Sequence, residues 1–600
     1  MGLELIAARG LVREQAATAV VSRTPRQNRH LQQKFAAFET LSEGLDYAAQ
    51  GQTGFNFYSS RGVLQHVLTY TALRQLALVT ARKLLSLGLK RGDRVAVIAE
   101  TGPDFMGVFF ACQYAGLIPC PMPYTMYIGG KESYIDRIAG MLAAAKACAV
   151  ITSDDLLNYV SEAAGRGGIA HVLTHAALQA LPEAATKLEP FGADECAYIQ
   201  YSSGSTSSPK GVLISQKAII ANTRGILRDG LKLTPDDRAF SWLPLYHDMG
   251  LVGFCLSPMM GQVTVDFLAT TSFARRPTLW LKLMSDNQTT ITFSPSFGFD
   301  LAARRINGEA VTLNLSRLRI AGIGGDMVRA DVLHHFARTL SVAGFDERAF
   351  LPSYGMAETT LAISFPDSRQ PVRIDTIDRQ ALKLEGVARP AHKGDAARSF
   401  VTCGAPLPGS LVEIRSETGA ALGERSVGRI FVKSESMMAG YYDNADATAG
   451  AIGGDGFLET GDMGYWLDGE IVITGRAKDL ILHNGRNIWP QDIEWAAEQI
   501  EPLRSGDVAA FAVEGEDGDD DVVVLVQCRL HDDVQVEALR HKVAAVVHHS
   551  AGVECKVVMV PPKSLPFTSS GKLSRAGAKQ RYLSDEISEV VQPAFLQAAQ

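Results

Sequence analysis

The sequence predicts an α/β protein of more than one domain, on the strength of three observations. Its 600 residues are too many for one hydrophobic core. From residue 68 to residue 354, segments of helical periodicity alternate with short apolar segments, which is typical of parallel sheets with crossover helices. After Val401 the pattern changes to short strands and turns. We expect a large N-terminal domain of two doubly wound α/β subdomains with a small β-rich, barrel-like subdomain, then a small α+β C-terminal domain.

The expected elements follow from periodicity and from turn residues, in order along the chain. Helices are predicted at 68–85, 104–114, 134–145, 216–231 and 280–284. Strands are predicted at 94–99, 149–152, 196–200, 212–214, 238–245, 289–293, 318–325, 350–354, 412–415, 428–433, 470–474 and 522–527. The run 118–123 contains three prolines and is predicted to be a loop.

Composition excludes several classes of protein. The chain has 46% hydrophobic residues, 20% charged residues and a net charge of -7 with no basic run, so nucleic-acid binding is not expected. Its eight cysteines show no Cys-x-x-Cys spacing, which is typical of reduced thiols without a zinc site. No segment reaches the roughly 18 apolar residues of a membrane helix. Residues 1–35 lack the pattern of a secretory signal and form an N-terminal extension, so we expect a cytoplasmic enzyme without stable membrane insertion.

The segment most indicative of chemistry is Tyr-Ser-Ser-Gly-Ser-Thr-Ser-Ser-Pro-Lys-Gly at residues 201–211. Gly204 and Gly211 let the backbone approach a ligand, the hydroxyl and N–H groups can surround phosphate oxygens, and Lys210 adds a cation. A P-loop is excluded because Lys210 is followed by glycine and β-branched residues, not by a Ser or Thr that opens a helix. A solvated Ser-rich linker has the same composition, so the segment alone leaves that alternative open.

Five further motifs occur at intervals along the chain. They are Gly322-Ile-Gly-Gly-Asp-Met, Ser353-Tyr-Gly-Met-Ala-Glu-Thr, Glu459-Thr-Gly-Asp, Gly475-Arg-Ala-Lys-Asp-Leu-Ile and Pro566-Phe-Thr-Ser-Ser-Gly-Lys-Leu-Ser-Arg. Together with residues 201–211 they resemble, in order and over nearly the whole chain, the signatures of the acyl-adenylate-forming (ANL) enzymes. The phosphate-binding signature of that family has a glycine where this chain has Ser207.

The resemblance implies a nucleotide site that uses ATP and Mg²⁺. Asp462 would accept hydrogen bonds from both ribose hydroxyls beside Arg476, and Thr206 and Glu358 would hold the metal, since Mg²⁺ prefers oxygen ligands. Taken alone, Thr-Gly-Asp is a common turn and Arg476 could belong to a surface ion pair. The full set expected at ATP or AMP is Ser202, Ser203, Gly204, Ser205, Thr206, Lys210, Gly324, Gly325, Asp326, Ser353, Tyr354, Gly355, Met356, Asp462 and Arg476.

The same resemblance implies catalytic and acyl-binding residues. Lys572 would bridge the acyl carboxylate and the α-phosphate in the transition state, where charge shifts between them. His247 would border the carboxylate and gate the acyl tunnel, and it would not act as a base. Aromatic residues at this spacing are core by default. The residues expected at the acyl chain are Tyr246, His247, Phe293 and Phe297.

The resemblance also implies domain boundaries. The N-terminal adenylation domain would span 36–477, with an insertion at 366–399 and the β-rich subdomain at 400–477. Residues 478–600 would form a mobile lid that rotates about the hinge residue Lys478 between two half-reactions.

Two features indicate which acyl-activating enzymes the chain resembles. Glu358 and Gly404 lie 46 positions apart, about twice the spacing in the CoA-forming relatives. An insertion here is similar to that of the stand-alone bacterial fatty acyl-AMP ligases, in which it restrains the lid and hinders use of free CoA. The segment Asn484-Gly-Arg-Asn-Ile-Trp-Pro-Gln-Asp-Ile-Glu also resembles those ligases. The alternative for the insertion is a tolerated surface loop, since long insertions cost little.

We therefore expect a fatty acyl-AMP ligase that activates a fatty acid as its adenylate and passes the acyl group to the phosphopantetheine thiol of a holo acyl carrier protein. Three alternatives remain. One is a medium- or long-chain acyl-CoA synthetase. Another is an amino-acid adenylation protein, which would need an Asp in the substrate pocket. The last is a non-catalytic acyl-nucleotide sensor, against which Lys572, Glu358 and Asp462 argue.

Overall fold

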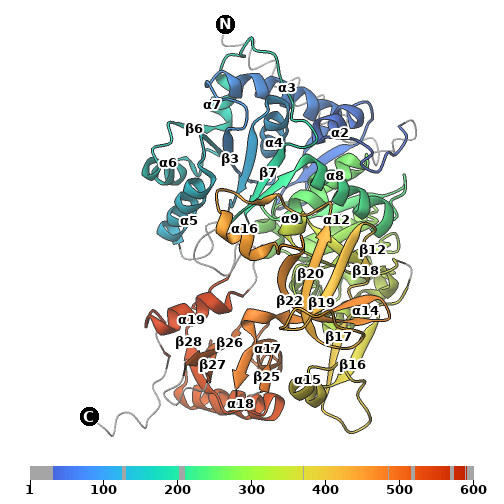
Figure 1. Cartoon of the computed structure of the whole chain (residues 1–600), viewed down its shortest axis with the longest axis vertical. Coiled ribbons are helices and arrows are strands. Elements are labelled where there is room, and N and C mark those ends of the chain that lie inside the picture. Colours follow the sequence, from blue (N-terminus) through green and yellow to red (C-terminus); the bar gives the residue numbers. More distant parts are fainter. Residues whose placement is uncertain are drawn as a thin grey trace.

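The computed structural model in Figure 1 describes residues 31–124, 130–201, 210–368, 370–483, 486–514, 520–567, 573–587 and 589–590. Two α/β units occupy the blue to green part of the chain, antiparallel strands follow in yellow and orange, and a separate α+β unit in red ends the chain. The predicted fold class, a mixed α/β protein with a large N-terminal and a small C-terminal part, is confirmed.

The first unit is a parallel sheet in the order β4-β3-β5-β6 with helices between its strands. Its elements are β3 (Arg94–Ile98), α4 (Pro103–Ala115), β4 (Ile118–Met122), α5 (Gly130–Ala145), β5 (Ala149–Thr152), α6 (Leu157–Arg166), β6 (His171–Thr174) and α7 (His175–Ala180). Of these, β3, α4, α5 and β5 match predicted segments, whereas α6, β6 and α7 were not predicted.

The prediction of a loop at 118–123 is wrong, because residues 118–122 form strand β4. Pro119 and Pro121 pair in parallel register with Val95 and Val97 of β3. The two prolines are two residues apart, so their nitrogens point to the same side of the strand. Because β4 is the edge strand of its sheet, that side can be the open one, away from β3. An edge strand tolerates proline because no ladder bond is lost on its open side.

The second unit is a larger sheet in the order β13-β12-β11-β9-β10-β1-β2. All neighbours are parallel except the hairpin of β1 with β2, which was not predicted. The last two residues of β2, Leu68 and Thr69, were predicted to begin a helix. The strands are β1 (Gly54–Tyr58), β2 (Leu64–Thr69), β9 (Arg238–Ser241), β10 (Thr264–Leu268), β11 (Ile291–Ser294), β12 (Ile320–Ile323) and β13 (Phe350–Pro352). The helices that precede or connect these strands in the chain are α2 (Leu41–Ala48), α3 (Tyr70–Leu85), α8 (Gln216–Arg224), α11 (Thr270–Arg275), α12 (Thr278–Asp286), α13 (Ser296–Arg305) and α14 (Ala330–Leu340), of which α3 packs on α4 of the first unit.

Two helices of this unit contain π-helical segments. The helix predicted at 216–231 is α8 followed by the π segment η1 (Gly225–Gly230). A second π segment, η2 (Leu251–Leu256), joins α9 (Asp248–Gly250) to α10 (Ser257–Met260). Segments of this kind are rare and occur frequently at functional sites.

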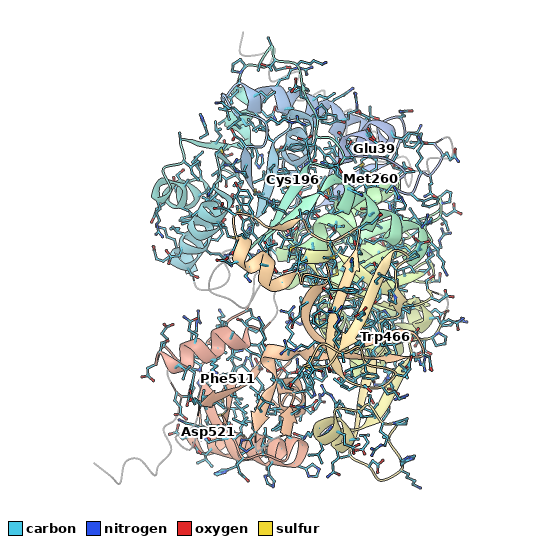
Figure 2. The ribbon with its side chains drawn as sticks, viewed as in Figure 1. Glu39, Cys196, Met260, Trp466, Phe511 and Asp521 are labelled. Carbon is cyan, nitrogen blue, oxygen red and sulfur yellow. The ribbon has the colours of Figure 1, made fainter. Side chains whose placement is uncertain are left out.

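The Ser-rich segment connects two antiparallel strands, as predicted. They are β7 (Cys196–Tyr201) and β8 (Gly211–Ser215), and β21 (Gly440–Tyr441) pairs with β8 on the other side. Figure 2 labels Cys196 at the start of β7. Residues 202–209 lie outside the described residues.

The β-rich part contains an antiparallel sheet in the order β19-β20-β22-β23. Residues 366–401 contribute a hairpin of β16 with β17 and the short helix α15. The elements are β14 (Tyr354–Gly355), β15 (Ala362–Phe365), β16 (Ile374–Asp378), α15 (Arg379–Glu385), β17 (Ala397–Val401), β18 (Ala405–Pro406), β19 (Ser410–Arg415), β20 (Gly428–Ser434), α16 (Ala445–Ala451), β22 (Leu458–Leu467) and β23 (Glu470–Arg476).

The C-terminal unit has its own core around the sheet β26-β27-β28. Phe511, labelled in Figure 2, lies on β26 and packs at 5.8 Å from the ring of Tyr582 on α19. The elements are β24 (Ile481–His483), β25 (Arg486–Ile488), α17 (Pro490–Ala497), β26 (Val508–Glu514), β27 (Asp520–Gln527), α18 (Asp533–Ala551), β28 (Lys556–Val560) and α19 (Arg575–Leu583). None of the helices in the described ranges is long and apolar enough to span a membrane.

Candidate active site

A cavity of about 680 Å³ lies where the second sheet, the β-rich part and the C-terminal unit meet. Its wall combines residues from almost every motif that the sequence analysis singled out. Those that line it are Lys210, His247, Phe293, Phe297, Gly324, Gly325, Asp326, Ser353, Tyr354, Gly355, Met356, Glu358, Asp462, Arg476 and Lys478. Positions that are up to 268 residues apart in the chain are therefore brought to one site by the fold.

The glycine motifs form one side of the cavity, where two loops follow β12 and β13. Gly325 has φ +81, a conformation that side-chain-bearing residues rarely adopt. At Gly355 a Cβ atom would lie 1.8 Å from the carbonyl oxygen of Leu361. Asp326 is held from the neighbouring α13, because Ser296 donates a hydrogen bond to its Oδ1 from the backbone N at 3.2 Å. The backbone at Gly325 and Gly355 therefore cannot accept a larger residue without moving.

Tyr354, Asp462 and Arg476 form a hydrogen-bonded cluster in the cavity wall. The hydroxyl of Tyr354 donates to Asp462 Oδ2 at 2.8 Å, and Arg476 Nε donates to Oδ1 at 3.1 Å. Asp462 and Arg476 are cross-strand partners on β22 and β23. Burial raises the pKa of Tyr354 well above its ordinary value, and the Asp462 carboxylate raises the pKa of Arg476. A carboxylate has about four acceptor positions, so two remain on Asp462, which suits a pair of ribose hydroxyls.

Glu358 is a buried carboxylate with one side-chain partner that the structure records. The Tyr441 hydroxyl donates to its Oε1 at 2.9 Å, and Lys210 Nζ lies 4.9 Å from the centre of the Tyr441 ring. Burial raises the pKa of Glu358 above its ordinary value. Within the described residues, no three His, Cys, Asp or Glu side chains cluster to hold a metal by themselves. Thr206, the other expected metal residue, lies outside the described residues, as do Ser202, Ser203, Gly204 and Ser205.

His247 follows β9 and caps the N-terminus of α9. Its Nδ1 lies 3.3 Å from the backbone N of Met249 and 2.6 Å from Asp248 Oδ1, and that carboxylate oxygen accepts a hydrogen bond from the Met249 N–H at 2.7 Å. These contacts all lie within residues 247–249, so the local chain sets how the imidazole sits in the cavity wall.

The four expected acyl-binding residues do not all line the cavity. His247, Phe293 and Phe297 do, and the Phe293 ring lies so close to Gly322 that a Cβ there would be 2.0 Å from it. Tyr246 is not among the lining residues. It is 6% exposed, and its carbonyl oxygen accepts a hydrogen bond from Gln200 Nε2 at 2.6 Å.

The sequence reasoning missed most of the apolar end of the cavity, which the two π segments and the neighbouring strands build. No sequence motif distinguishes these residues from ordinary residues of the hydrophobic core. They are Ile226, Leu227, Leu231, Leu233, Ala239, Gly253, Phe254, Pro258, Val263, Ile291, Leu361, Ala362 and Phe365.

The C-terminal unit closes the cavity from the opposite side. Phe567 and Leu573, which flank the segment that contains Lys572, both line it, while Lys572 lies outside the described residues. Arg575 holds this unit together by pairing with Glu494 at 2.7 Å and Asp479 at 2.9 Å. Lys478 also lines the cavity, and burial together with the nearby Arg476 lowers its pKa.

One ion pair joins the second sheet unit to the C-terminal unit at the cavity. Arg329 lies 3.3 Å from Glu498 and 5.2 Å from the Trp495 ring centre, and it also pairs with Asp331 at 2.8 Å. Burial raises the pKa of Glu498 to about 7.

Residues 374–401 also contact the C-terminal unit, where α15 and the end of α18 lie close together at the foot of Figure 1. Phe400 and Val401, at the end of this segment, line the cavity. Arg379 Nη1 donates to the Ser550 carbonyl at 2.6 Å, and Lys383 Nζ donates to the Ala551 carbonyl at 2.9 Å. Arg398 and Asp492 pair at 2.9 Å with only 5% of each side chain exposed. A shared apolar cluster includes Ile377, Leu382, Phe400 and Trp489.

Comparison with known proteins agrees with this geometry. The chain is 50% identical over 554 residues to a Caulobacter vibrioides protein named "Putative acyl-CoA synthetase", covering 92% of this chain and 96% of that protein. It is 31% identical over 569 residues to the medium-chain-fatty-acid--[acyl-carrier-protein] ligase JamA of Moorena producens, covering 91% and 95%. A solved structure from a study of fatty acyl-adenylate ligases of E. coli and L. pneumophila matches with TM-score 0.89 and 44% identity, covering 92% of this chain and 100% of that one.

The model of the AMP-binding enzyme family matches residues 48–442. This match confirms the resemblance to adenylate-forming enzymes that the motifs indicated. On these grounds, and with the Tyr354–Asp462–Arg476 cluster and the glycine loops facing one cavity, the chain belongs to the AMP-binding enzyme family.

Proposed function

We propose that this protein activates a fatty acid with ATP as an acyl adenylate and then passes the acyl group to the phosphopantetheine thiol of an acyl carrier protein. One observation carries the proposal. A single cavity joins a polar end, with Asp462, Arg476 and Glu358, to an apolar end long enough to be lined by two π segments. An anionic nucleotide and an apolar tail can therefore lie in one continuous space.

In the first half-reaction a carboxylate oxygen of the fatty acid attacks the α-phosphorus of ATP. An acyl–O–P bond forms, the bond from that phosphorus to the bridging oxygen breaks, and pyrophosphate leaves with its electron pair. The glycine loops and Asp462 hold the nucleotide, and His247 borders the carboxylate. Lys572 stabilises the charge that shifts between the two reactants. Its segment is flanked by Phe567 and Leu573, both in the cavity wall.

The residues at Glu358 fit a magnesium ion. Its carboxylate is buried and lines the cavity, and burial raises its pKa, a cost that a bound divalent cation would offset. Mg²⁺ commonly binds one or two carboxylates together with substrate phosphates and water, so Glu358 with Thr206 is a sufficient protein contribution. When bound, the ion would neutralise phosphate charge.

The contacts between the insertion and the C-terminal unit bear on whether the acyl group passes to a carrier protein or to free CoA. The second half-reaction needs that unit to rotate so that Lys572 leaves the site and a thiol enters, with Lys478 as the hinge. The contacts of Arg379, Lys383 and Arg398 hold it against residues 374–401. We infer that the insertion favours a carrier protein, which can bind outside the cavity and deliver its thiol, over free CoA. The reaction is assigned to the cytoplasm, where ATP and carrier proteins are present.

A competition assay tests the acceptor. The protein is given ATP, Mg²⁺, a fatty acid, CoA and a holo acyl carrier protein together, and both thioesters are measured by mass spectrometry. Acyl carrier protein is expected to receive the acyl group, while acyl-CoA forms slowly. Rapid acyl-CoA formation by the unaltered protein would favour the alternative, a fatty acyl-CoA synthetase; the Caulobacter relative carries the name "Putative acyl-CoA synthetase".

Arg379→Ala sharpens this test. Loss of the hydrogen bond to Ser550 should loosen the C-terminal unit and raise the rate of acyl-CoA formation by about threefold to tenfold, since one charged hydrogen bond contributes roughly 1.5 kcal/mol. Arg389→Ala is the matched control, because Arg389 lies in the same insertion and pairs with Glu385 of that insertion. Equal rates of acyl-CoA formation by the two variants would show that the contact of the insertion with Ser550 does not limit the use of CoA.

A further inference from the structure

Tyr441, on β21, lies between two charged groups at the polar end of the cavity. Its hydroxyl donates a hydrogen bond to Glu358 Oε1 at 2.9 Å, and Lys210 Nζ lies 4.9 Å from the centre of its ring. All three residues line the cavity. One side chain therefore contacts both the carboxylate that we propose for magnesium and the lysine of the Ser-rich segment.

The backbone around Tyr441 fixes where this side chain lies. Tyr441 pairs with Val212 of β8, the strand that begins one residue after Lys210. On the other side, the N–H of Met438 donates a hydrogen bond to the carbonyl oxygen of Glu358 at 2.8 Å. The segment that carries Tyr441 is thus bonded to the chain both beside Lys210 and at Glu358, so its side chain can hold the two groups at a constant separation.

Each contact suits a group whose charge the proposed reaction needs. A carboxylate has about four acceptor positions, and the Tyr441 hydroxyl takes one of them on Glu358, so the carboxylate can also bind a cation. Carboxylates that bind metals are usually hydrogen-bonded in turn, and this outer bond fixes their orientation. The face of an aromatic ring attracts a cation without neutralising it. The Tyr441 ring can therefore hold the ammonium group of Lys210 while its positive charge acts on a phosphate.

We propose that Tyr441 is a positioning residue, which orients Glu358 toward magnesium with its hydroxyl and Lys210 toward the phosphates of ATP with its ring. This inference rests on the proposed function, because it concerns the ATP and Mg²⁺ that the polar end would bind. Tyr441 was not among the residues expected at the site, and only the fold brings it to two residues that are distant in the chain. Because the hydroxyl and the ring have separate roles, they can be removed one at a time.

The test measures equilibrium binding of an ATP analogue with a methylene group between its α- and β-phosphates, which cannot release pyrophosphate. Its Kd is determined by calorimetry with Mg²⁺ and, separately, with a chelator in place of the metal. Tyr441→Phe keeps the ring and removes the hydroxyl. This variant should bind the magnesium-loaded analogue about tenfold more weakly, a typical effect of losing a hydrogen bond to a metal-binding carboxylate. It should bind the metal-free analogue as the unaltered protein does.

Tyr441→Leu removes the hydroxyl and the ring together. The ratio of its two Kd values should match that of Tyr441→Phe. It should also bind the metal-free analogue about threefold more weakly than Tyr441→Phe, because Lys210 loses the aromatic face. Tyr442→Phe is the matched control, since Tyr442 is the next residue in the chain but does not line the cavity. Its two Kd values should equal those of the unaltered protein.

The outcomes separate the inference from the function on which it rests. An unchanged Kd of Tyr441→Phe for the magnesium-loaded analogue would overturn the role of the hydroxyl. Equal binding of the metal-free analogue by Tyr441→Phe and Tyr441→Leu would overturn the role of the ring. Equal weakening of Tyr441→Phe with and without Mg²⁺ would indicate a general disturbance of the fold and overturn the proposal. No binding of the analogue by the unaltered protein would overturn the proposed function and the inference together.

Discussion

The two ends of the cavity offer a ligand different kinds of contact. At the polar end, which we propose binds the nucleotide, Tyr354, Asp462 and Arg476 are fixed to one another by hydrogen bonds of 2.8 and 3.1 Å. At the acyl end, apolar side chains from η1, η2 and the strands present area. Polar contacts depend on geometry, whereas apolar burial contributes in proportion to area, about 0.8 kcal/mol for each CH₂. A single substitution should therefore lower activity strongly at the polar end and only slightly at the apolar end.

The largest effect is expected for Asp462→Ala. Removing this carboxylate takes away the partner of both Tyr354 and Arg476 and the acceptor that we propose for the ribose hydroxyls, so ATP–pyrophosphate exchange should fall by two to three orders of magnitude, or roughly 3 to 4 kcal/mol. Asp468→Asn is the control, since Asp468 lies in the turn between the same two strands and pairs with Arg373 in solvent. If Asp462→Ala kept more than a tenth of the activity, the contrast between the two ends would fail.

A smaller effect is expected for Glu498→Gln, on the side of the cavity formed by the C-terminal unit. The substitution should change how the free energy of unfolding depends on pH. The pKa of Glu498 is raised in the folded protein to about 7 from an ordinary value of 4.5. A raised pKa means that the folded state binds the proton more tightly. The stability contributed by this group is therefore fully present below about pH 4.5 and is lost as pH rises through about 7.

Denaturation with urea across this range measures the difference. Relative to Glu498→Gln, the unaltered protein should lose roughly 3 kcal/mol of unfolding free energy as pH rises from about 4.5 to above 7, because each pKa unit corresponds to 1.36 kcal/mol. Glu514→Gln, at an exposed position, should follow the unaltered protein. Parallel curves for the unaltered protein and Glu498→Gln would show that this contact does not titrate there.

The smallest effect is expected for Gly253→Ala at the acyl end. The added Cβ would meet Leu361 at 3.6 Å, an ordinary contact, so the fold should accept it. The methyl group narrows the cavity, and kcat/KM for a methyl-branched acid relative to a linear one should fall by about threefold, since one apolar group is worth roughly 1 kcal/mol. Gly140→Ala is the control, because a Cβ there meets nothing within 4 Å. A loss of several hundredfold would show that the acyl end is as strict as the nucleotide end.

Much of the nucleotide end was predictable from the chain. Gly324, Gly325, Tyr354, Asp462 and Arg476 were named from motifs, and all five line the cavity. The acyl end was not, since Phe293 and Phe297 line it but Tyr246 does not, and residues such as Leu231 and Phe254 carry no local mark. The strand at 118–122 was mistaken for a loop because an edge position, which tolerates proline, is a property of the sheet.

The sequence by itself determined the α/β alternation, the adenylate-forming family and the polar motifs, because phosphate and sugar recognition needs particular residue types at short, fixed spacings. The tertiary structure decided the shape of the acyl end and the contacts of Arg379, Lys383 and Arg398 with the C-terminal unit. These features depend on packing between segments far apart in the chain, where any apolar residue of suitable size can serve, so no local pattern records them.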